Sequence, residues 1–558
     1  MSKSVSKRSR FLSRVVVPAV AALFLALPGG MSSTVALAQT KPFVHAIPND
    51  INSLDPADIK GQQDQEIGVN IYERLVQFKF YEQEDGTLVA DGTEVVPQLA
   101  ESWEIDGPTI TFHLRKDVKF YPTGNPMTAE DVRYSFQRLV EIPANGKNQS
   151  GIAGYFTADQ VKVIDDYTVA ITFMDGPNGT PTLIPVSLTS MKFQQFAIID
   201  SVEVKKHATA EDPWAREWLQ KNVATTGPYY IADRKLNEQL TLKAVPNHWS
   251  GEQPAFETVV LRITGKADLV SLVRGGAVDY AAEGLTGRQY DALQAAGFPV
   301  YHGNTPSILR VSFAMDKEPF TDARLRKAVL YAIPIDKIIN TALSGRGERA
   351  ICLYNPNDPV CTNGYKDYGL GNLEKAKELL VEAGKPDGFE FDFWFSNALP
   401  YNTDIAILMA DALKQVGIKM NLKPTPALQL VTAYRARING EDETMSGMYL
   451  HEFVIWLDDP STLTNSSIVT RTDKGGTGNW ARFNDPRVDE LHYTYRNSGD
   501  VEARTKAYQE LQDRVLAESA AMNPLIVMGR TIATSPKITH VTFSQDPYVR
   551  YVYLKPKE

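Results

Sequence analysis

Short runs rich in β-branched and aromatic residues alternate with longer runs of helical periodicity along the whole chain after about residue 40. This alternation is typical of α/β proteins, in which helices cover the faces of a sheet. No segment repeats at a fixed period and none is of low complexity, so a repeat array is excluded. The pattern therefore predicts a compact α/β protein.

The expected elements follow from residue type and from turn and capping signals. The strand-like runs are residues 43–47, 109–114, 168–173, 239–244, 258–263, 309–313 and 389–395. The helix-like runs are residues 129–139, 323–333, 373–383, 404–416 and 501–518. Thr128 precedes the first helix as an N-cap and Gly384 follows the third as a C′ residue, which supports these bounds.

The N-terminal segment has the order of a secretory signal peptide. Lys3, Lys7, Arg8, Arg10 and Arg14 precede an apolar run at 15–27, and small residues end at Ala38. This apolar run is shorter than the roughly 20 residues that span a bilayer, so a retained membrane anchor is the weaker alternative. We expect cleavage near Ala38 (signal peptide 1–38) and release of a mature protein into the periplasm.

Charge excludes some classes of partner. The full chain carries a net charge of −9, and removal of the five positive charges of the signal leaves about −14. Such an acidic protein is a poor partner for nucleic acid or anionic lipid. We therefore expect a soluble protein that binds no nucleic acid.

The chain contains two cysteines, Cys352 and Cys361, on either side of a loop rich in Asn and Pro. In an oxidising compartment this spacing favours a disulfide that closes the loop. A metal site or a redox site is the alternative, although each would need more ligands or a C-x-x-C spacing. We expect no bound metal and no cofactor.

Signatures of catalysis are missing from the sequence. It contains no H-E-x-x-H, no G-x-S-x-G, no P-loop and no strand-linked G-x-G-x-x-G, and its eight His residues are scattered. It is instead rich in rings, with 7 Trp, 24 Tyr and 23 Phe, which suit a concave site for a small ligand and also the packing of cores. The sequence therefore favours a binding protein over an enzyme.

Several stretches, in order, resemble one family. They are NSLDP at 52–56, NIYERLV at 70–76, PQLAESWE at 97–104, TFHLRKDVKF at 111–120, MTAEDV at 127–132, TGPY at 226–229, NHW at 247–249, EPFTDARLRKA at 318–328 and NDPRVD at 484–489. Together they resemble the extracellular solute-binding proteins that include the oligopeptide-, dipeptide- and nickel-binding components of ABC importers. Most of these stretches set a turn residue beside an apolar one, which indicates a role in the fold rather than in ligand contact.

The resemblance implies a two-lobed periplasmic-binding-protein fold of type II, with the large architecture of peptide binders. The implied domains are a discontinuous lobe I, an inserted subdomain of lobe I, and lobe II: 39–72 with 193–306 and 529–558, then 73–192, then 307–528. Ligand would be enclosed when the lobes close. The implied partners are a small-molecule or peptide ligand and an inner-membrane ABC permease, and the protein is expected to be a monomer.

One segment departs from the family pattern. Peptide-binding relatives carry Trp-x-x-Asp-x-x-(Asp/Glu)-Pro, whose first Asp holds the peptide ammonium, whereas here residues 453–460 read FVIWLDDP. Trp456 therefore occupies the ammonium position, where an indole supplies only a cation-π contact. Peptide stays one ligand class, and a sugar, an opine or a metal chelate that stacks on Trp456 is the alternative.

The resemblance also implies candidate ligand-binding residues. They are Gly61 and Gln62 in lobe I, Tyr155 in the inserted subdomain, and Arg310, Trp394, His451, Phe453, Trp456 and Asp458 in lobe II. If Arg310 faces the ligand, its guanidinium suits a carboxylate or a phosphate.

The main hypothesis is therefore a solute receptor of an ABC importer. An enzyme would instead bring an acid, a base or a nucleophile together in the cleft. A periplasmic chaperone-like or adhesion protein would expose its rings in apolar patches rather than enclose them.

Overall fold

The computed structural model describes residues 41–59, 61–142, 150–176, 179–356, 358–362, 365–441, 443–455, 457–472 and 478–557. Within these residues, eleven strands form one mixed sheet in the order β15-β14-β16-β12-β17-β11-β1-β10-β9-β8, with β13 paired to β17. Their bounds are β1 Phe43–Ile47, β8 Tyr229–Lys235, β9 Gln239–Ala244, β10 Thr258–Ile263, β11 Tyr280–Ala281, β12 Val300–Phe313, β13 Glu348–Arg349, β14 Glu390–Ser396, β15 Lys419–Thr425, β16 Met448–Val454 and β17 Met522–Thr534.

Three smaller sheets accompany the large one. They contain β4 Ala100–Asp106, β5 Thr109–Leu114, β7 Thr168–Thr172 and β6 Val161–Asp165; then β19 Thr542–Phe543, β3 Leu88–Pro97 and β2 Val76–Glu82; then β18 Ile538–Thr539 and β20 Lys555–Pro556.

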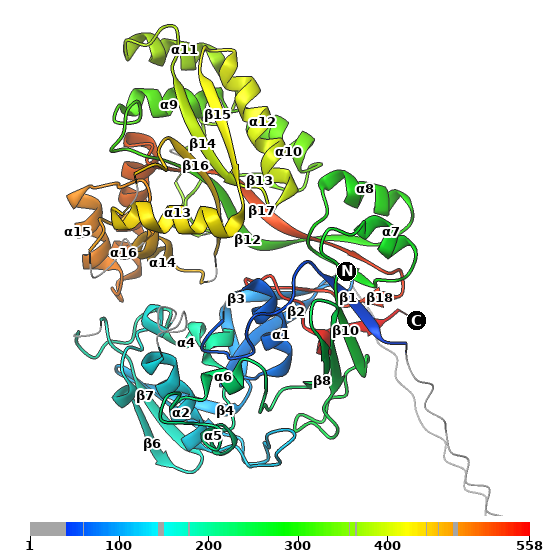
Figure 1. Cartoon of the computed structure of the whole chain (residues 1–558). Coiled ribbons are helices and arrows are strands. Elements are labelled where there is room, and N and C mark those ends of the chain that lie inside the picture. Colours follow the sequence, from blue (N-terminus) through cyan, green and yellow to red (C-terminus); the bar gives the residue numbers. More distant parts are fainter. Residues whose placement is uncertain are drawn as a thin grey trace, which may run out of the picture. The chain divides into compact units, whose positions relative to one another are not determined.

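Helices surround these sheets (Figure 1). They are α1 Gln62–Ile71, α2 Ala129–Glu141, α4 Ser187–Ser190, α5 Ser201–Lys205, α6 Arg216–Leu219, α7 Leu269–Arg274, α8 Gly287–Ala295, α9 Ala323–Ala332, α10 Ile335–Ala342, α11 Leu373–Glu382, α12 Pro400–Lys414, α13 Ala427–Asn439, α14 Pro460–Leu463, α15 Pro486–Tyr495 and α16 Val501–Asp513. Two π-helical turns, Thr464–Ile468 and Arg514–Glu518, extend α14 and α16. None of the helices in the described residues is both long and apolar enough to span a membrane.

Three large apolar cores lie in different parts of the chain. One packs β1, β8, β9 and β10 against the C-terminal segment, with Phe43, Leu242 and Tyr551 fully buried. A second packs α2 against β4, β5 and β7. The third packs β12, β14 and β16 against α9 to α12. Because side chains alternate across a strand, Leu309 and Val311 of β12 enter this third core and Arg310 does not.

The strands β12 and β17 connect the first and third cores. They pair antiparallel along their length, from Val300 with Ala533 to Ser312 with Met522 (Figure 1). The pairing shifts register between Gly303 and Ser307. Residues at this shift therefore lie between two separately packed regions.

The loop between the two cysteines is closed as the sequence favours. Cys352 and Cys361 form a disulfide with their Cα atoms 5.4 Å apart. Cys352 is buried in the third core. The loop is therefore attached to the body of that region at both ends.

Candidate functional site

A cavity of about 400 Å³ lies beside the register shift, and we call it the large cavity. Its walls come from the start of α1, the segment 282–287, β12, the end of α10, the start of α12, β16 and β17. These segments belong to both the first and the third core regions. Polar side chains that line this cavity include Gln62, Glu283, Arg346, Tyr401, Glu452 and Arg530.

On one wall, two amides hold the carboxylate of Glu283. Gln62, the first residue of α1, donates its amide to Glu283 Oε1, and Gln63 Nε2 donates to Oε2 at 3.3 Å. Burial raises the pKa of Glu283, while the charge of Arg530 and the Gln62 hydrogen bond lower it. Gln62, a residue expected to face the ligand, therefore orients a carboxylate that the sequence analysis did not single out.

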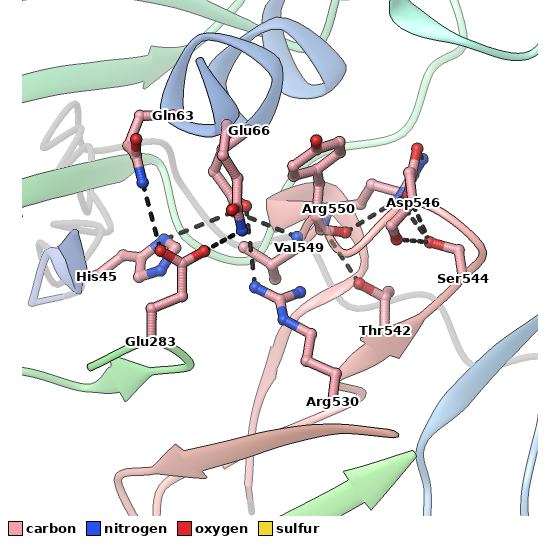
Figure 2. Close-up of polar contacts among 12 residues, drawn as sticks. His45, Gln63, Glu66, Glu283, Arg530, Thr542, Ser544, Asp546, Val549 and Arg550 are labelled. Atoms are coloured by element: carbon pink, nitrogen blue, oxygen red, sulfur yellow. Dashed lines mark hydrogen bonds and ion pairs between the residues drawn. The ribbon is translucent and has the colours of Figure 1, made fainter. Parts of the chain in front are cut away.

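Behind this wall, a buried polar network fixes Arg530 (Figure 2). Arg530 Nη2 lies 3.9 Å from Glu66 Oε2, and His45 Nδ1 lies 3.7 Å from Glu66 Oε1. Burial raises the pKa of Glu66 to about 8 against the opposing charge of Arg530. Burial, with Arg530, also lowers the pKa of His45 to about 3, so this imidazole is neutral at neutral pH. With a pKa of about 8, Glu66 is largely protonated at neutral pH, and Arg530 also faces the carboxylate of Glu283.

On the opposite wall, Glu452 of β16 accepts two hydroxyl hydrogen bonds. Ser307 Oγ donates to its Oε1 at 2.5 Å, and the Tyr401 hydroxyl donates to its Oε2 at 3.1 Å. In the part of the chain that the structure describes, no Lys or Arg lies within ion-pair distance of Glu452. Its charge is therefore held by neutral donors alone.

Three of the expected residues come together on the other face of the β12–β16 pair. Arg310 Nε lies 3.3 Å from His451 Nδ1, and its guanidinium stacks over the Phe453 ring at 4.7 Å. Arg310 Nη2 also donates to Ser467 Oγ at 3.4 Å, and Nη1 contacts Met522 Sδ at 2.9 Å. Arg310 of β12 is paired with His451 of β16, and Phe453 lies two residues from His451, so that its side chain is on the same face.

Arg310 is only 3% exposed, and no carboxylate of the described residues pairs with it. Burial lowers the pKa of Arg310 to about 10, so the group still carries its charge at neutral pH. The same burial, with the charge of Arg310, lowers the pKa of His451 well below its usual value. A buried guanidinium without a counter-charge can bind a carboxylate or a phosphate.

Asp458 lies beside Phe453 in a second, much smaller cavity, which Tyr354 and Asn355 also line. Asn355 Nδ2 donates to Asp458 Oδ2 at 2.8 Å, and burial raises the pKa of Asp458. The neighbouring Asp459 caps α14 and accepts two hydrogen bonds from Arg504 Nη2, both at 2.8 Å. Asp459 therefore has a structural role, although it lines the small cavity together with Asp458 and Asp358.

Gly61 and Trp394 are not among the residues that line the large cavity. Gly61 is the N-cap of α1. The half-buried Trp394 donates its indole N–H to the Ser446 carbonyl at 2.8 Å and packs with Tyr449 and Trp480. Trp456 lies outside the described residues.

Tyr155 corrects the expectation of a ligand contact from the inserted subdomain. Its side chain is fully buried in the second core, where it packs edge-to-face on Phe136 with ring centroids 5.3 Å apart. It lines neither cavity. The ring was expected at the ligand because of its position in the family resemblance, and an aromatic residue serves equally well in a core.

Sequence reasoning missed Glu283, Tyr401, Glu452 and Arg530. Glu452 is adjacent to the expected His451 and Phe453, so strand alternation places it on the opposite face of the strand. Alternation does not reveal that a cavity lies on that face. Glu283 and Tyr401 lie at segment ends with no distinguishing pattern.

Comparisons with known proteins agree on one family. Residues 94–473 match the model of bacterial extracellular solute-binding proteins, family 5. Heme-binding protein A of Haemophilus influenzae is 28% identical over 86% of this chain and 85% of its own length. The periplasmic oligopeptide-binding protein OppA of Escherichia coli is 26% identical over 99% of each chain.

A solved structure supports the same fold. The periplasmic binding protein DppA of Helicobacter pylori, in complex with the peptide STSA, superposes with a TM-score of 0.74. It is 22% identical, and the match covers 93% of this chain and 98% of that one. The fold is therefore the two-lobed α/β fold of type II periplasmic binding proteins.

Proposed function

The chain belongs to family 5 of the bacterial extracellular solute-binding proteins, and from that premise we propose that it captures a peptide or a peptide-sized solute in the large cavity. It then delivers this ligand to an inner-membrane ABC permease. The members of the family found by comparison are binding proteins, and we propose that this chain likewise acts without catalysis. We further propose that it works as a monomer in the periplasm after cleavage near Ala38.

The observation that carries the proposal is the composition of the large cavity. Its volume of about 400 Å³ falls in the range of about 300–1,000 Å³ found for small-ligand sites. Gln62 and Glu283 on one side and Tyr401 and Glu452 on the other offer directional hydrogen-bonding groups. A ligand that contacts both sides would favour closure, because only differential contact shifts a conformational equilibrium.

The proposed lobes meet at the β12–β17 pair. Lobe I (39–72, 193–306 and 529–558, with 73–192 inserted) and lobe II (307–528) would be joined where β12 shifts register. The separate cores on either side of this point support that division.

The peptide class is supported by the relatives that bind peptides by name. A sugar, an opine or a metal chelate is the second candidate, and the Trp at position 456 favours it because an indole face stacks well on rings.

Native mass spectrometry of the protein purified from a periplasmic extract tests the proposal. We expect a one-to-one complex that releases a peptide on denaturation, and a melting temperature that rises when the peptide is added back. A released sugar, opine or chelate would replace the peptide class with the second candidate. Protein that binds no small molecule from the extract, and whose melting temperature no peptide changes, would contradict the receptor function.

A further inference from the structure

Two carboxylates from distant parts of the sequence line the large cavity, and among the described residues neither has a Lys or Arg within ion-pair distance. Glu283 follows β11 and Glu452 lies in β16. Glu283 is held by the amides of Gln62 and Gln63, and Glu452 by the hydroxyls of Ser307 and Tyr401. A carboxylate offers about four acceptor positions, so each group keeps free acceptor capacity.

The basic residues of the cavity are engaged elsewhere. Arg346 Nη2 lies 2.7 Å from Asp291 Oδ1, and its Nη1 donates to the Gly287 carbonyl at 3.2 Å. Arg530 faces Glu66 as well as Glu283. The described lining thus contains two glutamates and two arginines, and Glu452 is the lining carboxylate that has neither arginine as a neighbour.

A carboxylate that loses water when a ligand fills the cavity needs a compensating positive charge. Glu452 lines one wall and Glu283 the other, so a cationic ligand that fills the cavity can contact both sides. Such a contact is made only in the closed arrangement and therefore promotes closure.

We propose that the large cavity holds an ammonium or guanidinium group of the ligand between Glu283 and Glu452, so that the protein selects cationic ligands. This inference rests on the receptor function proposed above. It assigns to these two residues the task that a carboxylate at position 456 performs in peptide-binding relatives, where this chain has Trp.

Wild-type protein is first mixed with a defined pool and analysed by native mass spectrometry. The pool contains dipeptides with free amino groups, the same dipeptides N-acetylated, putrescine, arginine, glucose and citrate. We expect the retained molecules to carry an ammonium or guanidinium group. Retention of N-acetylated dipeptides, glucose or citrate in preference to the cationic molecules would overturn the inference, but it would still agree with the proposed receptor function. Retention of nothing would count against the receptor function and, with it, the inference.

Calorimetry on the best-bound amine and its N-acetyl derivative then tests the two residues. Glu452→Gln and Glu283→Gln remove the charge, preserve the size of the side chain and keep one of the two acceptor oxygens of each carboxylate. Each substitution should weaken binding of the amine by roughly tenfold or more and leave the affinity for the N-acetyl derivative unchanged. The exposed Glu502→Gln, whose carboxylate pairs with Lys506 on α16, is the matched control and should bind like the wild type.

The two readouts distinguish a binding role from a structural one. If Glu452 only supports the fold, Glu452→Gln would weaken the amine and its N-acetyl derivative by the same factor, and the inference would fail. Equal affinity of both Gln variants and the wild type for the amine would also overturn it. Loss that is confined to the free amine, with an unchanged melting temperature of the ligand-free protein, supports it.

Discussion

Asp55 and Arg138 form an ion pair that is almost completely shielded from solvent. Arg138 Nη1 and Nη2 donate to the two Asp55 oxygens at 2.9 and 2.6 Å, and the side chains are 1% and 0% exposed. Asp55 belongs to the NSLDP stretch that the sequence analysis assigned to the fold. The structure shows its partner, which lies 83 positions away on α2 and has no local signal.

We expect Asp55→Ala to lower the free energy of unfolding by about 3–5 kcal/mol, because it leaves a buried guanidinium without its counter-charge. Urea denaturation measures this change. Glu502→Ala breaks an exposed pair with Lys506 and should cost about 0–1 kcal/mol, which makes it a suitable control. Equal effects of the two variants would show that Arg138 finds another partner or reaches water.

His492 introduces a pH dependence of stability. It is fully buried, with Nδ1 3.0 Å from the Tyr508 hydroxyl and Nε2 3.2 Å from Asn465 Oδ1. Burial, with the charges of Arg496 and Arg504, lowers its pKa from 6.5 to about 3. Below pH 6.5 His492 is therefore protonated in the unfolded chain but stays neutral in the folded chain. The stability that neutral His492 contributes is lost as the pH falls toward 3.

The stability advantage of the wild type over His492→Gln should shrink by about 2 kcal/mol between pH 7 and pH 5, since one proton changes stability by about 1.4 kcal/mol per pH unit. Urea denaturation at both pH values gives the difference directly, and other titrating groups cancel because both proteins contain them. A pH-independent difference would mean that His492 has the same pKa in the folded and the unfolded chain.

At the scale of elements, local pattern predicted strands and helices well where one face is buried. The expected strands at 43–47, 109–114, 239–244 and 258–263 coincide with β1, β5, β9 and β10. The run at 309–313 was only the apolar end of β12, because the remainder, from Val300, pairs with β17 without a strong alternating pattern. Strand β16 was missed, since charged and aromatic residues mix along it.

The site was predicted only in part, for a related reason. The family resemblance named Arg310, His451 and Phe453, which the structure places on one face of a strand pair. Glu283 and Glu452 meet at a cavity because of tertiary packing between residues 169 positions apart, and no local pattern reports such a distance. Tyr155 was assigned to the ligand by its position in the family resemblance, and it lies in a core because a position carried over from relatives does not fix the packing of a ring in this chain.

The disulfide loop gives a prediction at this scale. A crosslink between Cys352 and Cys361 closes a short loop, and the loss of chain entropy in the unfolded state should stabilise the fold by about 2–3 kcal/mol. The double variant Cys352→Ala/Cys361→Ala should show this loss in urea denaturation. Adding a reductant should lower the free energy of unfolding of the wild type to a value similar to that of the variant, and it should not change the free energy of unfolding of the variant. A wild type insensitive to full reduction would contradict an entropic role for the bond.

At the scale of the whole molecule, Leu457 connects regions that otherwise have separate cores. It is 5% exposed and packs with Phe78, Val186 and Phe193. Leu457 belongs to the proposed lobe II, whereas its three neighbours belong to lobe I: Phe78 and Val186 lie in the inserted subdomain at 73–192, and Phe193 lies in the segment 193–306. This contact can form only when these two regions are together, so it should stabilise the closed arrangement without contributing to either large core.

We therefore expect Leu457→Ser to shift the ligand-free protein toward an open arrangement. Small-angle X-ray scattering should show a larger radius of gyration, and the apparent affinity for the ligand should fall in proportion to the closed fraction. Leu428→Ser, at a side chain on α13 that is 80% exposed, is the matched control and should change neither quantity. Saturating ligand should return Leu457→Ser to the radius of the liganded wild type, because ligand contacts to both sides still favour closure. If the radius and the affinity of Leu457→Ser both match the wild type, the Leu457 contact does not influence closure, and the equilibrium is then set by the β12–β17 connection and the ligand alone.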